Sequence, residues 1–284
     1  MSEIFKTKRV KKVPIESIDE RRRALQAACQ RRENPPFANL SDRARQEVLH
    51  HMLVNDDYGI LFCYVPKVGC SNWKRVIMVL DGWVDDPETV SGKPLDVLPI
   101  RLTKFSNEQV EYRLKYYKKF MFVRNPLDRI ISAYKDKLTG DNDYYQAYRV
   151  NWIIDKFRAE NQRANGSKGA TLEEFFKFLS TRDPADMDNH WMPFKNLCQP
   201  CAIDYDFIGK IENLKEDADE ILRRLNLSEI VKYPRKQSVY IEKARHMPST
   251  ADLLSQLPLS LIQAVLKIFE EDFELFLYHN PYSV

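Results

Sequence analysis

The chain has 284 residues, and its 44 Lys and Arg against 41 Asp and Glu leave a formal net charge of only +3. This near balance excludes a uniformly basic protein, so any attraction for an acidic ligand must come from local clusters, and we expect no nucleic-acid partner. No run of 18 apolar residues is present, and the basic start MSEIFKTKRVKKV is not followed by an apolar core. We therefore expect neither a signal peptide nor a membrane-spanning segment.

The cysteines are too few for a disulfide scaffold, and the single C-x-x-C motif lacks the second pair that a structural zinc site needs. We expect no metal site. Reduced, buried thiols are the first expectation, because free cysteine is among the most buried residue types. The five residues concerned are Cys29, Cys63, Cys70, Cys198 and Cys201.

Three N-x-[ST] triplets begin at Asn39, Asn165 and Asn226, although such triplets arise often by chance. Asn165 lies in the polar segment 161–169, which is typical of a surface loop. Composition alone therefore leaves the cellular compartment open.

The first 36 residues are charged and end in Asn34-Pro35-Pro36, a pattern typical of chain outside a folded core. We interpret residues 1–36 as a stem or N-terminal arm that contains a helix over residues 18–31. Residues 37–284 are interpreted as one domain, since the chain is short enough for a single α/β domain.

The apolar run GILFCYV, residues 59–65, predicts a buried strand, and the apolar residues of 73–80 have the spacing of one helical face. The loop between them would present backbone N–H groups and the positive end of a helix dipole to an anion. The ATPase pattern GxxxxGK[ST] is absent, because Gly69 is the only glycine there and Lys67 precedes it. The loop therefore predicts an anion site of another kind.

A long loop with three prolines over residues 83–105 and a helix over 107–117 lead to a second buried strand, KFMFV at 119–123. Asn125 is a good N-cap and Pro126 a preferred first residue for the helix that follows. Arg124 stands at the start of this helix, and Ser132 lies two turns in. Two such turns, carrying Lys67 and Arg124, fit a nucleotide with one anion at the 5′ end and another at the 3′ end.

Helical patterns dominate the C-terminal half. We predict helices over residues 144–163, 171–179, 212–225 and 257–276, with a short strand at 206–210. Strands that alternate with helices predict an α/β fold with a parallel sheet covered on both faces.

Three stretches resemble the Golgi carbohydrate sulfotransferases. PKVGCSNWKRV is similar to their 5′-phosphosulfate-binding loop and FVRNPLDRIISAY to their 3′-phosphate-binding segment. NHWMPFKNLCQPCAIDYDFIGKIENL, residues 189–214, resembles the chondroitin and dermatan 4-O-sulfotransferase group, and the dermatan members more closely. The similarity runs from about residue 23 to the C-terminus and implies the three-layer sulfotransferase fold, with a sheet like that of P-loop kinases.

The resemblance also implies the donor, 3′-phosphoadenosine 5′-phosphosulfate (PAPS), and its product, 3′-phosphoadenosine 5′-phosphate (PAP), without a metal. Lys67 would stabilise charge on the departing 5′-phosphate, and Arg124 and Ser132 would hold the 3′-phosphate. The implied nucleotide-binding residues are Pro66, Lys67, Val68, Gly69, Cys70, Ser71 and Asn72 in the first segment, and Arg124, Asn125, Pro126, Leu127, Asp128, Arg129, Ile130, Ile131 and Ser132 in the second.

His190 is the candidate base or acceptor ligand, because it is the only histidine inside a family-like motif and none lies between Arg75 and Arg124. The alternative is a histidine that only orders the loop around Trp191. Lys74 and Arg75 are either ligands or part of an exposed helix face.

An acidic glycosaminoglycan would be the acceptor. A basic and aromatic set could line its groove, or could be ordinary solvated surface: Tyr116, Tyr117, Lys118, Lys119, Lys232, Arg235 and Lys236. The family is anchored in the Golgi membrane and faces the lumen, so the anchor would be absent from this chain. In that oxidising compartment the Cys198 and Cys201 pair and Cys29 become disulfide candidates, and at least one of the five cysteines stays unpaired.

We therefore expect sulfuryl transfer to the 4-hydroxyl of N-acetylgalactosamine in chondroitin or dermatan. Related sulfotransferases that act on terminal N-acetylgalactosamine of N-glycans or on glucuronic acid are alternatives, as is an inactive glycan-binding protein of the same fold. A kinase is disfavoured by the missing ATPase loop.

Overall fold

The computed structural model describes residues 16–90, 92, 99–139, 143–158, 169–235 and 248–282. Its centre is a four-stranded sheet in the order β1-β2-β3-β4. The strands are β1 (Met52–Asn55), β2 (Ile60–Cys63), β3 (Lys118–Val123) and β4 (Phe207–Lys210). β2, β3 and β4 are parallel, which confirms the three predicted strands, whereas the antiparallel edge strand β1 was not predicted.

Both predicted turns from a strand into a helix are present. β2 leads into α3 (Cys70–Leu80), whose predicted apolar face is buried. β3 leads into α6 (Pro126–Lys137), where the Asn125 side chain accepts a hydrogen bond from the Leu127 N–H. Because β2 and β3 are parallel neighbours, the two helix N-termini lie at the same edge of the sheet.

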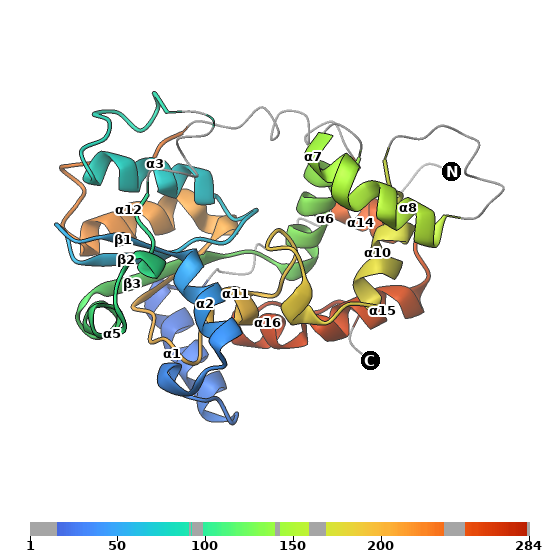
Figure 1. Cartoon of the computed structure of the whole chain (residues 1–284), viewed down its shortest axis with the longest axis horizontal. Helices are drawn as coiled ribbons and strands as arrows, with labels where there is room; N and C mark the ends of the chain where they lie inside the picture. The colour runs from blue at the N-terminus through green and yellow to red at the C-terminus, as the bar shows by residue number, and fades with distance from the viewer. Residues whose placement is uncertain are drawn as a thin grey trace, which may run out of the picture.

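Helices cover both faces of the sheet, which gives the expected three layers. In Figure 1, α3 and α12 (Leu214–Arg224) lie above the sheet, and α1 (Ile18–Gln30) and α2 (Asp42–His51) lie below it. On the upper face the Trp73 ring lies 4.7 Å from that of Phe120 and 5.3 Å from that of Phe122. This aromatic cluster packs α3 against β3.

Helix α1 is part of the core, which corrects the expectation that residues up to 36 lie outside it. Ile18, Leu25 and Ala28 are buried in the main hydrophobic cluster. Arg21 forms a buried ion pair with Asp217 of α12. The many charges of this segment hid a narrow apolar face, although the helix itself was predicted.

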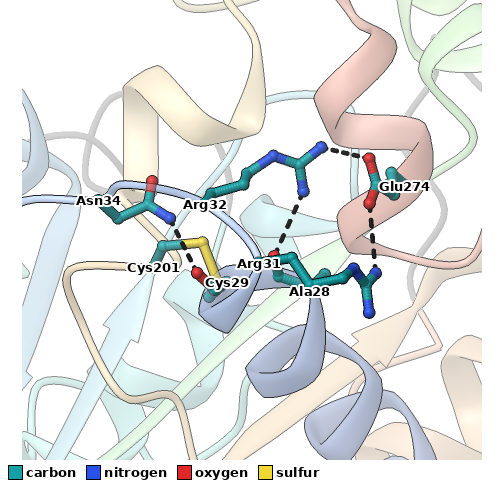
Figure 2. Close-up of a disulfide and its surroundings, with 7 residues drawn as sticks. All are labelled: Ala28, Cys29, Arg31, Arg32, Asn34, Cys201 and Glu274. Carbon is teal, nitrogen blue, oxygen red and sulfur yellow. Dashed lines mark hydrogen bonds and ion pairs between the residues drawn. A yellow bond between two sulfur atoms is a disulfide. The ribbon is translucent and has the colours of Figure 1, made fainter.

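The end of α1 is fastened to two distant segments. Figure 2 shows the Cys29–Cys201 disulfide beside Arg31 and Arg32, which both pair with Glu274 of α16 (Glu270–Leu275). The disulfide and the two ion pairs therefore fix the C-terminal end of α1 to the core.

The other helices include most of those predicted, with different ends. They are α5 (Asn107–Tyr116), α7 (Asp143–Tyr145), α8 (Asn151–Phe157), α10 (Leu172–Ser180), α11 (Phe194–Cys198), α14 (Thr250–Leu254) and α15 (Leu259–Ile268), with 3₁₀ helices at Phe37–Asn39, Leu102–Lys104, Pro184–Asp186 and Ile211–Asn213. No helix in the described part of the chain is both long enough and apolar enough to cross a membrane.

Two predicted helices were too long. The helix expected over 144–163 ends at Phe157 and contains a π-helical segment, Gln146–Val150. The helix expected over 257–276 is divided at Phe269 into α15 and α16. Of the sequons, Asn39 and Asn226 are exposed, and Asn165 lies outside the described residues.

Two disulfides correct the expectation of reduced thiols. Cys29 pairs with Cys201 and Cys63 with Cys198, so the C-x-x-C cysteines bond to distant partners instead of to each other. Gln199, between them, has a left-handed backbone with a φ of 45° at the end of α11. The expected unpaired cysteine is Cys70.

Candidate active site

A cavity of about 1010 Å³ opens at the carboxyl ends of β2 and β3, where α3 and α6 begin. The predicted site residues in its walls are Pro66, Lys67, Gly69, Cys70, Ser71, Asn72, Arg124, Asp128, Ile131, Ser132 and His190. The predicted residues that lie outside its walls are Val68, Asn125, Pro126, Leu127, Arg129 and Ile130. Both predicted phosphate-binding segments and the predicted base therefore share one cavity.

The loop before α3 has an unusual backbone. Lys67 and Gly69 both have left-handed conformations, with φ of 73° and 78°. A non-glycine residue in this region costs about 1–3 kcal/mol, and such strain tends to occur at functional sites. A distant segment holds the start of α3 in place, because Asn72 Nδ2 donates a hydrogen bond to the Pro234 carbonyl at 3.1 Å. Its backbone N–H groups and the N-terminus of α3 form the kind of concave surface that binds phosphate.

Lys67 is held in place by a carboxylate that the sequence interpretation missed. Its Nζ donates to Asp136 Oδ2 at 3.0 Å, and Lys137 Nζ lies 3.1 Å from the same oxygen. Burial lowers the pKa of Lys67, and Asp136 opposes this effect. Burial would raise the pKa of Asp136, but the two lysines outweigh it and the net shift is downward. Asp136 is therefore ionised and orients Lys67.

Arg124 and Arg129, which the sequence placed in one group, have different positions. Arg124 Nη1 donates to the Lys67 carbonyl at 3.3 Å, and its side chain reaches the cavity wall. Arg129 is fully buried and donates to three backbone carbonyls, those of Pro66, Asn189 and Met192. The prediction that the Arg129 side chain contacts the nucleotide is therefore corrected. This arginine instead joins the Lys67 loop to the His190 loop.

His190 belongs to a small polar network. Its Nδ1 lies 2.8 Å from Asp188 Oδ1, and the Tyr145 hydroxyl lies 2.8 Å from the same nitrogen and 3.1 Å from Asp188 Oδ2. Burial lowers the pKa of His190, Asp188 opposes this, and the nearby Lys137 and Lys67 lower it further. A neutral ring whose Nδ1–H donates to Asp188 leaves Nε2 as the proton acceptor.

Lys74 and Arg75 are not on an exposed helix face. Both are buried and both line the cavity. Lys74 Nζ lies 4.5 Å from the centre of the Tyr64 ring, and Arg75 Nε donates to the Val90 carbonyl at 2.9 Å. The exposed-face alternative is therefore wrong, and their position in the cavity supports the alternative role as ligands.

The predicted acceptor groove is corrected as well. Tyr116 is the last residue of α5 and Lys118 the first residue of β3, about 20 Å along the strand from Arg124 at roughly 3.3 Å per residue. Lys119 is buried, and its Nζ donates to the Tyr117 carbonyl at 2.7 Å. The remaining members, Lys232 and Arg235, flank Pro234 beside the Asn72 loop, and Lys236 lies outside the described residues.

Several wall residues were missed by the sequence interpretation. One signal was available: Asp128, Ser132 and Asp136 are four residues apart and so share a face of α6. No comparable pattern pointed to Tyr145, which is far from His190 in sequence. Among the described residues, no group of three or more His, Cys, Asp or Glu side chains is placed to hold a metal ion.

Comparison with known proteins identifies relatives that match most of this chain. A model described as the sulfotransferase family matches residues 50–279. Carbohydrate sulfotransferase 14 of Danio rerio is 38% identical over 265 residues, covering 92% of this chain and 71% of the relative. Carbohydrate sulfotransferase 14 of Homo sapiens is also 38% identical, with 93% and 69% covered. Carbohydrate sulfotransferase 8 of Mus musculus is 33% identical, with 93% and 64% covered. No solved structure matches the chain.

Proposed function

Since this chain belongs to the sulfotransferase family, as a relative of the carbohydrate sulfotransferases, we propose that it transfers a sulfuryl group from PAPS to the 4-hydroxyl of N-acetylgalactosamine in chondroitin or dermatan. The observation that carries the proposal is the meeting of Lys67, Arg124, Ser132 and His190 around one cavity. The finer specificity rests on the resemblance of residues 189–214 to the 4-O-sulfotransferase group.

The N–H groups and cations around the cavity fit a nucleotide with two separated anions. Two helix N-termini open into the cavity, and each has a cation beside it, Lys67 at α3 and Arg124 at α6. The first loop needs glycine at position 69, because the backbone there is left-handed and an added Cβ would lie 3.0 Å from the Tyr233 hydroxyl. Arg124 and Ser132 would hold the 3′-phosphate, and the Lys67 loop the 5′-phosphosulfate.

Lys67 is the group that would stabilise the leaving phosphate. PAPS supplies an activated sulfuryl group, and its transfer builds negative charge on the 5′-phosphate oxygens. Asp136 keeps the Lys67 ammonium directed into the site, so little reorganisation is needed when that charge develops. A contact that strengthens during the reaction raises kcat more than it raises donor affinity.

His190 is the group that would accept the proton of the attacking hydroxyl. Its lowered pKa keeps the ring neutral at pH 7, and Asp188 fixes the proton on Nδ1. The Nε2 lone pair can then take the hydroxyl proton as the S–O bond to the acceptor forms. Asp188 and Tyr145 act through His190 as positioning residues.

Two further features support a Golgi lumenal enzyme. The disulfides Cys29–Cys201 and Cys63–Cys198 suit an oxidising compartment. The exposed sequons at Asn39 and Asn226 are accessible for glycosylation there.

The test is incubation with radiolabelled PAPS and a panel of desulfated chondroitin, desulfated dermatan and N-glycans that end in N-acetylgalactosamine. We expect 4-O-sulfated disaccharides from chondroitin or dermatan after enzymatic digestion. We also expect Lys67→Ala to lower kcat by at least tenfold, while its Kd for PAP changes less. Transfer only to the N-glycans or to glucuronic acid would contradict the proposed acceptor. Binding of PAP without transfer to any acceptor would favour an inactive glycan-binding protein of the same fold.

A further inference from the structure

A row of exposed aromatic side chains follows the segment from α7 to α8. Tyr144 is 66% exposed, Tyr148 68% and Trp152 41%. The three residues are spaced four apart along this helical segment. The rings of Tyr144 and Tyr148 lie 5.0 Å apart. Scattered surface aromatics need no explanation, but exposed aromatic side chains that gather in one place can mark an interaction site.

The row begins at the candidate active site. The Tyr144 ring meets that of Tyr145 edge-on at 5.5 Å, and Tyr145 meets the His190 ring edge-on at 5.6 Å. The π-helical segment Gln146–Val150 lies within the row, and such segments occur frequently at functional sites. The strip is therefore continuous with the predicted base and separate from both nucleotide-binding segments.

Cations border the row. Lys156 Nζ lies 5.1 Å and Arg182 Cζ 4.4 Å from the centre of a Trp152 ring, and Arg149 is exposed on the same helical segment. The segment also carries Asp143 and Asp155, so the cations that border the row outnumber the carboxylates only slightly. An aromatic strip with bordering cations suits a ligand that combines apolar ring faces with negative groups.

We propose that Tyr144, Tyr148 and Trp152 bind the polysaccharide acceptor beyond the sugar that is sulfated. The C–H face of a sugar ring is apolar and packs on an aromatic ring, while the phenol hydroxyls can bond to sugar hydroxyls. The acidic groups of the polymer would lie near Arg149, Lys156 and Arg182. The inference rests on the proposed function and adds a subsite that selects a long acceptor over a short one.

The chain offers a matched control for the test. Tyr112 and Tyr116 on α5 are also four residues apart, 56% and 60% exposed, with rings 4.8 Å apart. Figure 1 shows α5 and α8 at opposite ends of the molecule. Tyr112→Ala/Tyr116→Ala therefore removes the same chemistry at a distant place.

The experiment measures the Kd of desulfated dermatan and of PAP by calorimetry, and KM for the polymer and for a tetrasaccharide. Tyr144→Ala/Tyr148→Ala should weaken polymer binding and raise the polymer KM by about tenfold, the scale of two lost aromatic contacts. The Kd of PAP and kcat at saturating acceptor should stay near the wild-type values, and the tetrasaccharide KM should rise less than the polymer KM, because a short acceptor reaches only the part of the row nearest His190. All values of the control variant should stay near those of the wild type.

The outcomes separate this inference from the proposed function. If the wild type sulfates the polymer but the Tyr144/Tyr148 variant keeps its KM, or the control variant loses as much, the subsite is refuted and the function stands. If no acceptor is sulfated, yet the polymer binds and only the Tyr144/Tyr148 variant loses that binding, the function is refuted and the subsite stands. A wild type that does not bind the polymer refutes the subsite.

Discussion

His190 depends on its neighbours for its protonation state. Its pKa lies below the ordinary value of 6.5, mainly because of burial. As a base the ring must be neutral, so we expect kcat/KM to fall as the pH decreases through this lowered pKa. The measurement is a pH–rate profile together with an NMR titration of the ring, assigned with His190→Gln.

Asp188→Asn tests the same residue from its partner. Asp188 favours the protonated ring, so its neutralisation should lower the pKa of His190 again and move the acid limb to lower pH. The rate at pH 7.5 should fall as well, because the proton on Nδ1 is no longer fixed. An acid limb that moves to higher pH would contradict this arrangement.

Arg124 should recognise the 3′-phosphate. We expect Arg124→Gln to weaken the binding of PAP by about 1.5–3 kcal/mol, the usual value for a charge-assisted hydrogen bond. The binding of adenosine 5′-phosphate should weaken much less. Glutamine is shorter than arginine, so the bond from Arg124 Nη1 to the Lys67 carbonyl is lost as well, and the affinity for adenosine 5′-phosphate reports any resulting change in the loop. Equal losses for both nucleotides by calorimetry would remove Arg124 from the 3′ site.

The packing of β3, β4 and α3 depends on one glycine. A Cβ on Gly209 would lie 2.3 Å from the Phe122 ring, which is fully buried and packs against Trp73. We therefore expect Gly209→Ala to lower the free energy of unfolding by about 1–3 kcal/mol through overpacking, measured by urea denaturation. Adding Phe122→Leu should recover part of this loss. A double variant that loses the sum of the two single losses would show that the ring is not the cause.

The two disulfides connect parts of the molecule that the sheet does not. Cys63–Cys198 closes 135 residues and Cys29–Cys201 closes 172, and both end in the short segment 198–201. Cross-links over long loops restrict the unfolded chain most. Segment 198–201 therefore anchors both β2 and α1.

We expect Cys63→Ala/Cys198→Ala to lower the free energy of unfolding by about 2–5 kcal/mol, the usual cost of losing a native disulfide. The control is Cys70→Ala, which removes the unpaired thiol and should leave the unfolding midpoint in denaturant nearly unchanged. An unchanged midpoint in the first variant would mean that this disulfide contributes little to stability.

Local sequence patterns were enough to predict the two turns from a strand into a helix and, with them, the positions of Lys67 and Arg124. These features are local: an apolar run of strand length, a helical spacing of apolar residues, and a capping Asn-Pro pair specify each turn within about 20 residues. The three parallel strands followed for the same reason. The family resemblance added His190 as the candidate base and PAPS as the expected donor.

The contacts between groups that are distant in sequence became visible only in the folded chain. Asp136 pairs with Lys67 across 69 residues, Tyr145 reaches Asp188 across 43, and Cys29 reaches Cys201 across 172. Helix α1 joined the core because its few apolar residues share one face, which its many charges concealed. Such contacts depend on how elements pack in three dimensions, and neither periodicity nor composition along the chain records that packing.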